Sequence, residues 1–216
     1  MNFELAMNGD LAANSRAGSA AASENSSAEI SDNELVAQVL RGDETAFDRL
    51  FERHKRRVAR FAARYFNCSQ QVEETIQIAF TNAYFALPNF NGAHEKSFQA
   101  WLLRIANNVC LDALRKKNRL REDLLSELTD AETEFLREHL RDERAANAEN
   151  AAVSKDLAEK LLAKLDAEEQ TVLRLLDAAE MSAAEVAEIT GWSISNVKVR
   201  AHRARKRLRT ILNKFL

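Results

Sequence analysis

The chain has 216 residues and a formal net charge of −2 at pH 7, and this length allows one large domain or two small ones. Five glycines, one proline and abundant Ala, Leu, Glu and Arg favour an all-α fold. The two cysteines lie far apart, which excludes a disulfide framework and most zinc sites, and no apolar run approaches the roughly 20 residues of a membrane span. The N-terminus lacks the pattern of a secretory signal. We therefore expect a cytoplasmic protein with no cofactor and no metal.

The first 30 residues form an N-terminal tail. They are rich in Ala, Ser and Asn and show no periodic apolar pattern. Such a segment buries too little apolar surface to offset the entropy of ordering it. The pattern predicts a disordered tail over residues 1–30.

Residues 31–118 have the apolar periodicity of a helical bundle. Asp43 is placed to cap a long helix, and Pro88 is placed to stop another. Apolar residues recur at helical spacing between these signals. The predicted helices cover residues 34–40, 44–65, 70–87 and 97–117.

Residues 119–153 form an acidic linker in this interpretation. Between positions 121 and 150 there are ten acidic and four basic residues, a net charge of −6, and apolar residues are sparse. A solvated spacer is the favoured interpretation. The alternative is a segment that mimics nucleic acid or lies along a basic channel.

Residues 154–216 predict a second, smaller helical domain. Asp166 and Ser182 each begin a capping box, and Ser193 is a plausible cap for the last helix. Helices over residues 183–190 and 194–213 flank a turn at Gly191 and Trp192, which is the pattern of a helix-turn-helix motif. We expect Val197, Ala201, Ala204 and Leu208 of the last helix to pack against Val186 and Ile189.

The end of the chain carries a concentrated positive charge. Eight basic residues and no acidic residue lie between Asn196 and Leu216. After a capped helix and a turn, this pattern favours DNA binding over a merely solvated basic face. Lys198, Val199 and His202 are assigned to base edges in the major groove, and Arg200 and Arg203 to phosphates.

The first domain contains an aromatic and basic block. Phe85, Phe90, Phe98 and Trp101 surround the loop at residues 89–96, and a basic run follows at residues 115–119. Aromatic rings beside amides and cations suit unstacked bases and a backbone track. Aromatic residues at helical spacing also fill cores, so Phe98 and part of Trp101 are expected there, and the loop is the better candidate for a base pocket.

Together these blocks resemble a known family. The segments R-G-D-E-T-A-F-D-R-L-F to E-E-T-I-Q-I-A-F-T-N-A-Y and W-L-L-R-I-A-N-N-V-C-L-D-A-L-R resemble the promoter-melting region 2 of sigma-70 factors. The segment E-V-A-E-I-T-G-W-S-I-S-N-V-K-V-R-A-H-R-A-R-K-R-L resembles their −35-reading region 4. With only an acidic linker between them, the chain resembles the extracytoplasmic function (ECF) group.

The resemblance implies an RNA polymerase subunit that recognises −35 and −10 promoter elements and opens the duplex. Its implied partners are the β′ clamp and β flap of core polymerase, promoter DNA and an anti-sigma factor, with no membrane insertion. The implied core-binding residues are Glu73, Glu74 and Gln77. The implied −10 residues are Asn91, Phe98, Trp101, Arg104, Asn107, Asn108, Arg115 and Lys116. The implied −35 residues are Ser195, Asn196, Lys198, Val199, Arg200, His202 and Arg203.

The chain departs from the family pattern on the helix implied in core binding. Ile78 stands where the family usually has an acid, and Gln71 lies near a position where it usually has Asp. Both changes remove negative charge from the implied polymerase face.

Two other classes of function compete with this interpretation. A helix-turn-helix regulator with an N-terminal sensing or dimerisation domain would explain the C-terminal domain equally well, but not the block around Trp101. An enzyme is disfavoured because the sequence shows no metal-ligand spacing, phosphate-binding glycine loop or nucleophile elbow, and we expect no catalytic residue.

Overall fold

The computed structural model describes residues 30–92, 97–122, 131, 134 and 148–214. Within these ranges the chain forms helices joined by turns and contains no strand, which confirms the all-α prediction. The expected disordered tail, apart from Ile30, lies outside the described residues, as does most of the linker. The elements are α1 (Asp32–Leu40), α2 (Glu44–Ala62), α3 (Ser69–Ala86), the 3₁₀ turn η1 (Leu87–Asn89), α4 (Ser97–Glu122), α6 (Ala148–Leu162), α7 (Ala167–Leu173), the π-helical turn η2 (Arg174–Ala178), α8 (Ala183–Thr190) and α9 (Ile194–Leu212).

The helix starts follow the capping signals in the sequence. The side chains of Asp43 and Ser193 each accept a hydrogen bond from a backbone N–H in the first turn of the helix that follows. Asp166 and Ser182 form complete capping boxes with a glutamate three residues later. Since each cap satisfies a backbone donor that the helix leaves open, these positions fix where α2, α7, α8 and α9 begin.

The first domain is built from α1 to α4. Large apolar side chains of all four helices close its core, among them Leu35, Leu50, Phe80 and Leu102. α4 continues to Glu122, five residues beyond the predicted end at Lys117. None of the described helices is both long and apolar enough to cross a membrane.

A buried polar contact fixes α1 on α2. His54, 5% exposed, places its Nε2 2.7 Å from Asp32 Oδ2, and Arg53 donates to Asp32 Oδ1 at 2.7 Å. Burial raises the pKa of Asp32, but hydrogen bonds from His54 and Arg53 outweigh that effect and hold the pKa below its ordinary value of 3.8. The charged carboxylate is therefore favoured in the folded chain.

The last helix packs in two parts. Val197 and Ala201 are buried, as predicted, together with Val186 and Ile189 of α8. Ala204 and Leu208 instead pack with Leu165 and Leu173 at α7, and Leu208 also packs on α6. The prediction that all four apolar positions of α9 face α8 was therefore wrong for the second half, because α8 has only eight residues and α9 has nineteen.

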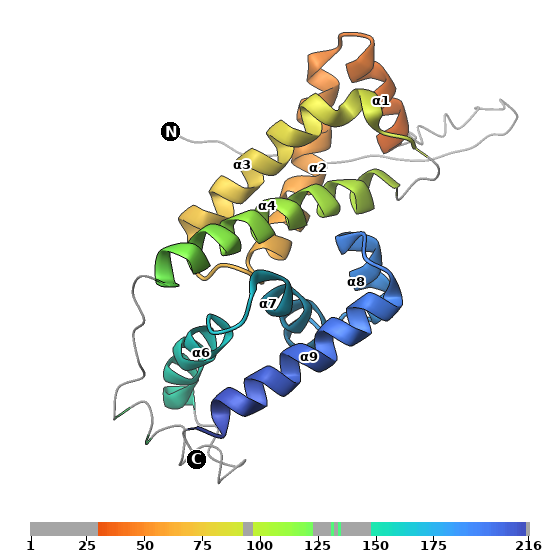
Figure 1. The fold of residues 1–216 in the computed structure, drawn as a ribbon. Coiled ribbons are helices and arrows are strands. Elements are labelled where there is room, and N and C mark those ends of the chain that lie inside the picture. Colours follow the sequence, from red (N-terminus) through yellow and green to blue (C-terminus); the bar gives the residue numbers. More distant parts are fainter. Residues whose placement is uncertain (1–29, 93–96, 123–130, 132–133, 135–147, 215–216) are drawn as a thin grey trace, which may run out of the picture.

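The two domains lie against each other along α4. One side of α4 packs on α2 and α3, and the other side contacts α7 and α8 (Figure 1). A single apolar cluster contains Leu102 and Leu114 of α4 together with Leu175, Val186 and Val197 of the second domain.

Candidate nucleic-acid interface

The helix-turn-helix motif is formed by α8, the turn at Gly191 and Trp192, and α9. Gly191 ends α8 with a φ of 76°, in the left-handed region where a residue without Cβ is favoured. The turn therefore fixes how α9 leaves α8.

The exposed side of α9 carries the side chains assigned to DNA. Val199 is 47% exposed although it is apolar, which suits contact with a base methyl group more than a role in packing. Arg200 is half-buried because its guanidinium lies 4.5 Å from the centre of the Trp192 ring, while its Nε donates to Asn196 Oδ1 at 2.8 Å. The predicted −35 residues that are exposed are Ser195, Asn196, Lys198, Val199, His202 and Arg203.

The aromatic block of the first domain is a real cluster. Phe90 lies 5.1 Å from Trp101 and 5.6 Å from Phe98 between ring centroids. Trp101 is half-buried, so one part of its ring supports the domain and another part reaches the surface. Phe85 is 76% exposed and contacts Tyr84, so it does not join this cluster in the way the sequence suggested.

Two of the predicted −10 residues cannot touch DNA in this structure. Phe98 and Asn107 are fully buried, at 0% exposure. Asn107 Oδ1 accepts a hydrogen bond from the buried Tyr65 hydroxyl at 2.9 Å, and Asn107 Nδ2 is buried without a hydrogen-bond partner. The assignment of both side chains to direct DNA contact is corrected accordingly. Phe98 contacts Phe90 and Trp101, so it supports that ring cluster from inside the domain.

Six −10 candidates remain: Trp101 is half-buried, and Asn91, Arg104, Asn108, Arg115 and Lys116 are exposed. Arg104 donates to the carbonyl of Glu188 in α8 at 2.9 Å. Arg115 forms ion pairs with Asp112 and with Glu168 of α7. The second domain therefore already occupies the functional groups of two cations assigned to promoter DNA.

The ion pair between Arg115 and Glu168 shifts the pKa of both groups. The hydrogen bond that Arg115 donates to Glu168 raises the pKa of Arg115 above its ordinary value. Burial raises the pKa of Glu168, but the hydrogen bond from Arg115 outweighs this and lowers it below 4.5. Both groups are therefore charged at neutral pH.

The loop after α3 approaches α1 closely. A Cβ added at Gly92 would meet Asn33 Oδ1 at 2.6 Å, so only glycine fits there without a shift. Asn33 Oδ1 is itself buried without a hydrogen-bond partner. Residues 93–96, which complete the predicted base pocket, lie outside the described residues.

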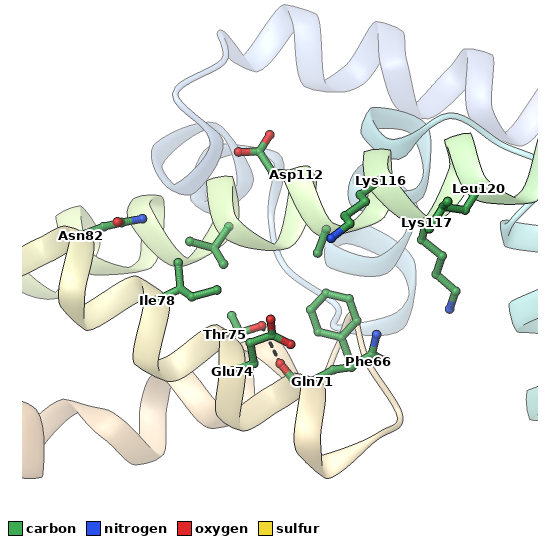
Figure 2. Close-up of a pocket in the computed structure, with 12 residues that line it drawn as sticks. Phe66, Gln71, Glu74, Thr75, Ile78, Asn82, Asp112, Lys116, Lys117 and Leu120 are labelled. Atoms are coloured by element: carbon green, nitrogen blue, oxygen red, sulfur yellow. Dashed lines mark hydrogen bonds between the residues drawn. The ribbon is translucent and has the colours of Figure 1, made fainter.

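The predicted core-binding residues share an exposed face of α3. Glu73, Glu74 and Gln77 are all exposed, and Gln77 Nε2 donates to Glu73 Oε1 at 3.4 Å. Beside them a groove of about 670 Å³ opens between α3 and α4 (Figure 2). Glu74, Gln71 and Ile78 line this groove, so the two departures from the family pattern fall in one place.

Sequence reasoning overlooked two contributors. Trp192 holds Arg200 through a cation–π contact, and Glu168 holds Arg115. Trp192 could have been suspected from an aromatic residue in the turn beside a basic helix. Glu168 carried no such signal, because its partner lies 53 positions away in the sequence. Among the residues that the structure describes there is no group of His, Cys, Asp or Glu arranged to hold a metal ion.

Comparison with known proteins gives matches over both helical domains. The sequence model named "Sigma-70 region 2" matches residues 50–120, and that named "Sigma-70, region 4" matches residues 155–208. The "ECF RNA polymerase sigma-E factor" of Haemophilus influenzae is 31% identical over 183 residues, which cover 82% of this chain and 93% of that protein. The "ECF RNA polymerase sigma factor SigW" of Bacillus subtilis is 31% identical over 180 residues, which cover 81% of this chain and 92% of that protein.

A solved structure is also similar. The "Structure of CnrH in complex with the cytosolic domain of CnrY" shares 27% sequence identity with this chain at a TM-score of 0.49, and the match covers 85% of this chain and 97% of the other.

Proposed function

This chain belongs to the extracytoplasmic function group of the sigma-70 family, and we propose how its helices divide the work of transcription initiation. As a sigma factor it directs promoter-specific initiation together with RNA polymerase. The observation that carries the proposal is the match of region 2 and region 4 to the two separate helical units, at residues 50–120 and 155–208. A helix-turn-helix regulator is not favoured, because it would leave the region 2 match unexplained.

We propose that α9 reads the −35 element from the major groove. The exposed Lys198, Val199 and His202 lie in the N-terminal half of α9, the part of a recognition helix that contacts base edges in motifs of this kind. Each good base contact contributes about 1–3 kcal/mol of discrimination. Arg200 and Arg203 contact phosphates in this proposal and set the register of the helix on the duplex.

The −10 surface consists of the loop from Asn91 onward and the adjacent side of α4. Flipping a base out of the duplex costs a few kcal/mol, and stacking on an aromatic ring returns about 1–3 kcal/mol per base. The accessible part of Trp101 offers such a ring, and the exposed Asn108 and Lys116 offer polar contacts about two and about four turns further along α4. Lys116 also lines the groove between α3 and α4. Phe98 and Asn107 act as positioning residues under this surface.

Core polymerase binds to the exposed face of α3 in this proposal. Glu73, Glu74 and Gln77 contact the β′ clamp, and the second domain contacts the β flap. Because Ile78 and Gln71 line the adjacent groove in place of acids, we expect a contact that is more apolar than the family pattern implies. Such a contact loses less affinity in salt than a purely ionic one.

The remaining partners follow from the family. We propose that an anti-sigma factor regulates the chain, that the linker passes between the two domains on the polymerase, and that the protein acts in the cytoplasm. The work is binding and strand separation, with no bond chemistry and no cofactor.

The proposal is tested by run-off transcription with core polymerase on a promoter library. Lys198→Ala should lower initiation only on promoters that carry the preferred −35 element, whereas the control Lys206→Ala removes the same charge from a later turn of α9. Equal losses from both variants on all promoters would contradict the assigned recognition face.

A second assay addresses core binding directly. Glu74→Lys should weaken capture of core polymerase, and Asp48→Lys on an exposed position of α2 provides the same change of charge away from α3. No association of the unaltered chain with core polymerase would refute the proposed function.

A further inference from the structure

One face of α2 carries a row of arginines that the −10, −35 and core-binding surfaces leave out. Neighbouring members of the row are three or four residues apart, which brings side chains to the same face of a helix. All of them are exposed. At 1.5 Å per residue the row extends over about 17 Å. We call it the arginine stripe, and it consists of Arg49, Arg53, Arg56, Arg57 and Arg60.

Most of the charge of the arginine stripe is not compensated. Arg53 pairs with Asp32 at 2.7 Å, and the other four members form no ion pair with any residue that the structure describes. Glu52, the acidic residue next to Arg53, pairs with Lys55 instead. Like charges three and four residues apart destabilise a helix. The stripe therefore has a cost in the free chain that an anionic partner would offset.

The middle of α2 lies next to the proposed −10 surface. Arg53 donates to the carbonyl of Ile30 at 2.9 Å, at the start of α1. The next residue, His54, is buried, and its ring centroid lies 5.3 Å from that of Phe98. The Phe98 ring in turn lies 5.7 Å from Trp101. Two packed rings thus connect the middle of α2 to the aromatic side chain proposed to stack on a base.

The chemistry of the stripe favours a phosphate backbone as its partner. One DNA strand carries a negative charge about every 3.4 Å along the duplex axis, so about five phosphates cover the length of the stripe. A protein partner would need a row of carboxylates of the same length. Arginine also presents a planar set of donors that fits a phosphate group in a bidentate way.

We propose that the arginine stripe binds the phosphodiester backbone of promoter DNA beside the −10 element and holds the strand whose base stacks on Trp101. The inference rests on the proposed function, because the −10 surface is what places DNA next to α2. Such contacts fix the position of the strand and carry no sequence information.

The test measures how the complex of core polymerase and the full chain binds a forked DNA fragment that carries a −10 element and no −35 element. Arg56→Gln with Arg60→Gln removes two unpaired members of the stripe. Each phosphate contact contributes about 0.7–0.9 to the slope of log affinity against log salt concentration. The gap in affinity between this variant and the unaltered chain should therefore widen about tenfold as salt falls from about 0.4 M to about 0.1 M.

A matched control removes the same charge from the same domain. Arg41 is exposed at the end of α1, and Lys55 lies on α2 outside the stripe. Arg41→Gln with Lys55→Gln should leave the salt dependence close to that of the unaltered chain. Equal changes in both double variants would overturn the inference, because net charge alone would then explain them.

Two further measurements separate a phosphate contact from a general defect. Arg56→Lys with Arg60→Lys keeps both charges and should restore most of the salt dependence. The glutamine variant should weaken binding to matched and altered −10 bases by the same factor, since a phosphate contact does not read sequence. Loss of base discrimination in that variant would contradict the proposal.

Neutral DNA linkages test the contact from the other side. On a fork whose backbone beside the −10 element carries methylphosphonates, the glutamine variant and the unaltered chain should bind equally well. A gap that persists on this neutral backbone would refute the contact.

Capture of core polymerase distinguishes the remaining explanations. If the glutamine variant loses core capture and keeps its affinity for DNA, the stripe binds an acidic protein surface and the inference is wrong. Normal run-off transcription by the unaltered chain, with no effect of the glutamine variant on DNA binding, removes the inference alone. An unaltered chain that neither captures core polymerase nor supports transcription removes the proposed function.

Discussion

Replacing Tyr65 by Phe removes one oxygen from the buried contact that holds Asn107 beneath the −10 surface. Tyr65 is 3% exposed, and its hydroxyl is the donor to Asn107 Oδ1. Phe fills the same space without the hydroxyl, so the carbonyl oxygen of a fully buried amide is left without a partner. Because the Nδ2 of Asn107 already lacks one, the whole amide group is then unsatisfied.

The expected loss follows from the desolvation of that oxygen. A buried polar group without a partner costs about 1–3 kcal/mol. For a chain of 216 residues this corresponds to a fall in Tm of roughly 2–12 °C. Urea unfolding followed by far-UV circular dichroism measures the free energy. Tyr84→Phe is the control, since Tyr84 is 38% exposed and surface changes of this kind stay within about 0.5 kcal/mol.

A double-mutant cycle isolates the contact. Asn107→Leu alone strands the Tyr65 hydroxyl, whereas Tyr65→Phe with Asn107→Leu removes both polar partners and is expected to be nearly neutral. The sum of the two single losses in free energy of unfolding should therefore exceed the loss in the double variant by about 1–3 kcal/mol. If the two single losses in free energy simply add up to the loss of the double variant, the hydrogen bond does not stabilise α4. That result would also refute the positioning role proposed for Asn107.

Three further outcomes are expected. Gly92→Ala should lower stability and −10-dependent transcription, because its Cβ meets Asn33 Oδ1 at 2.6 Å, and adding Asn33→Ala should restore both; no rescue would mean that the loop does not rest on α1. The pKa of Asp32 lies below its ordinary value, so its stabilisation is complete above that value and is lost as pH falls through the folded pKa. Asp32→Asn should therefore be less stable at neutral pH and should lose less stability on acidification, as measured by urea unfolding from about pH 7 to about pH 3. Burial raises the pKa of Cys110 to about 12, so a thiol reagent should modify Cys68 quickly and Cys110 only after denaturant is added; rapid reaction of both thiols would contradict the buried position.

Much of the fold could be predicted because its signals are local. Asp43, Asp166, Ser182 and Ser193 each place an acceptor directly before a helix, and the structure begins a helix after each of them. Capping depends on side chains within three residues of each other, so the sequence alone contains both partners.

The packing of Leu208 could not be predicted in this way. Helical spacing shows that Leu208 lies on the apolar side of α9, but it does not say which neighbour covers that side. The neighbours are Leu157 and Leu161 of α6 together with Leu165 and Leu173 at α7. Periodicity identifies a buried face and leaves its partner open.

Burial of Phe98 and Asn107 shows the same limit within the candidate site. Both lie in the block that resembles a promoter-melting motif, and both have side chains that suit base recognition. A helix presents its residues in all directions, so a functional block necessarily mixes surface side chains with supporting ones. Phe98 lies in the core and packs against Trp101. Asn107 accepts a hydrogen bond from Tyr65, which lies three residues after the end of α2.

The binding partners of Arg104 and Arg115 could not be predicted from the sequence. An exposed guanidinium suits a phosphate, a carboxylate and a helix C-terminal carbonyl through the same set of donors. In this structure Arg104 takes a carbonyl and Arg115 a carboxylate, both from the second domain. The sequence shows the donors, and only the packing of the two domains shows which acceptor each one takes.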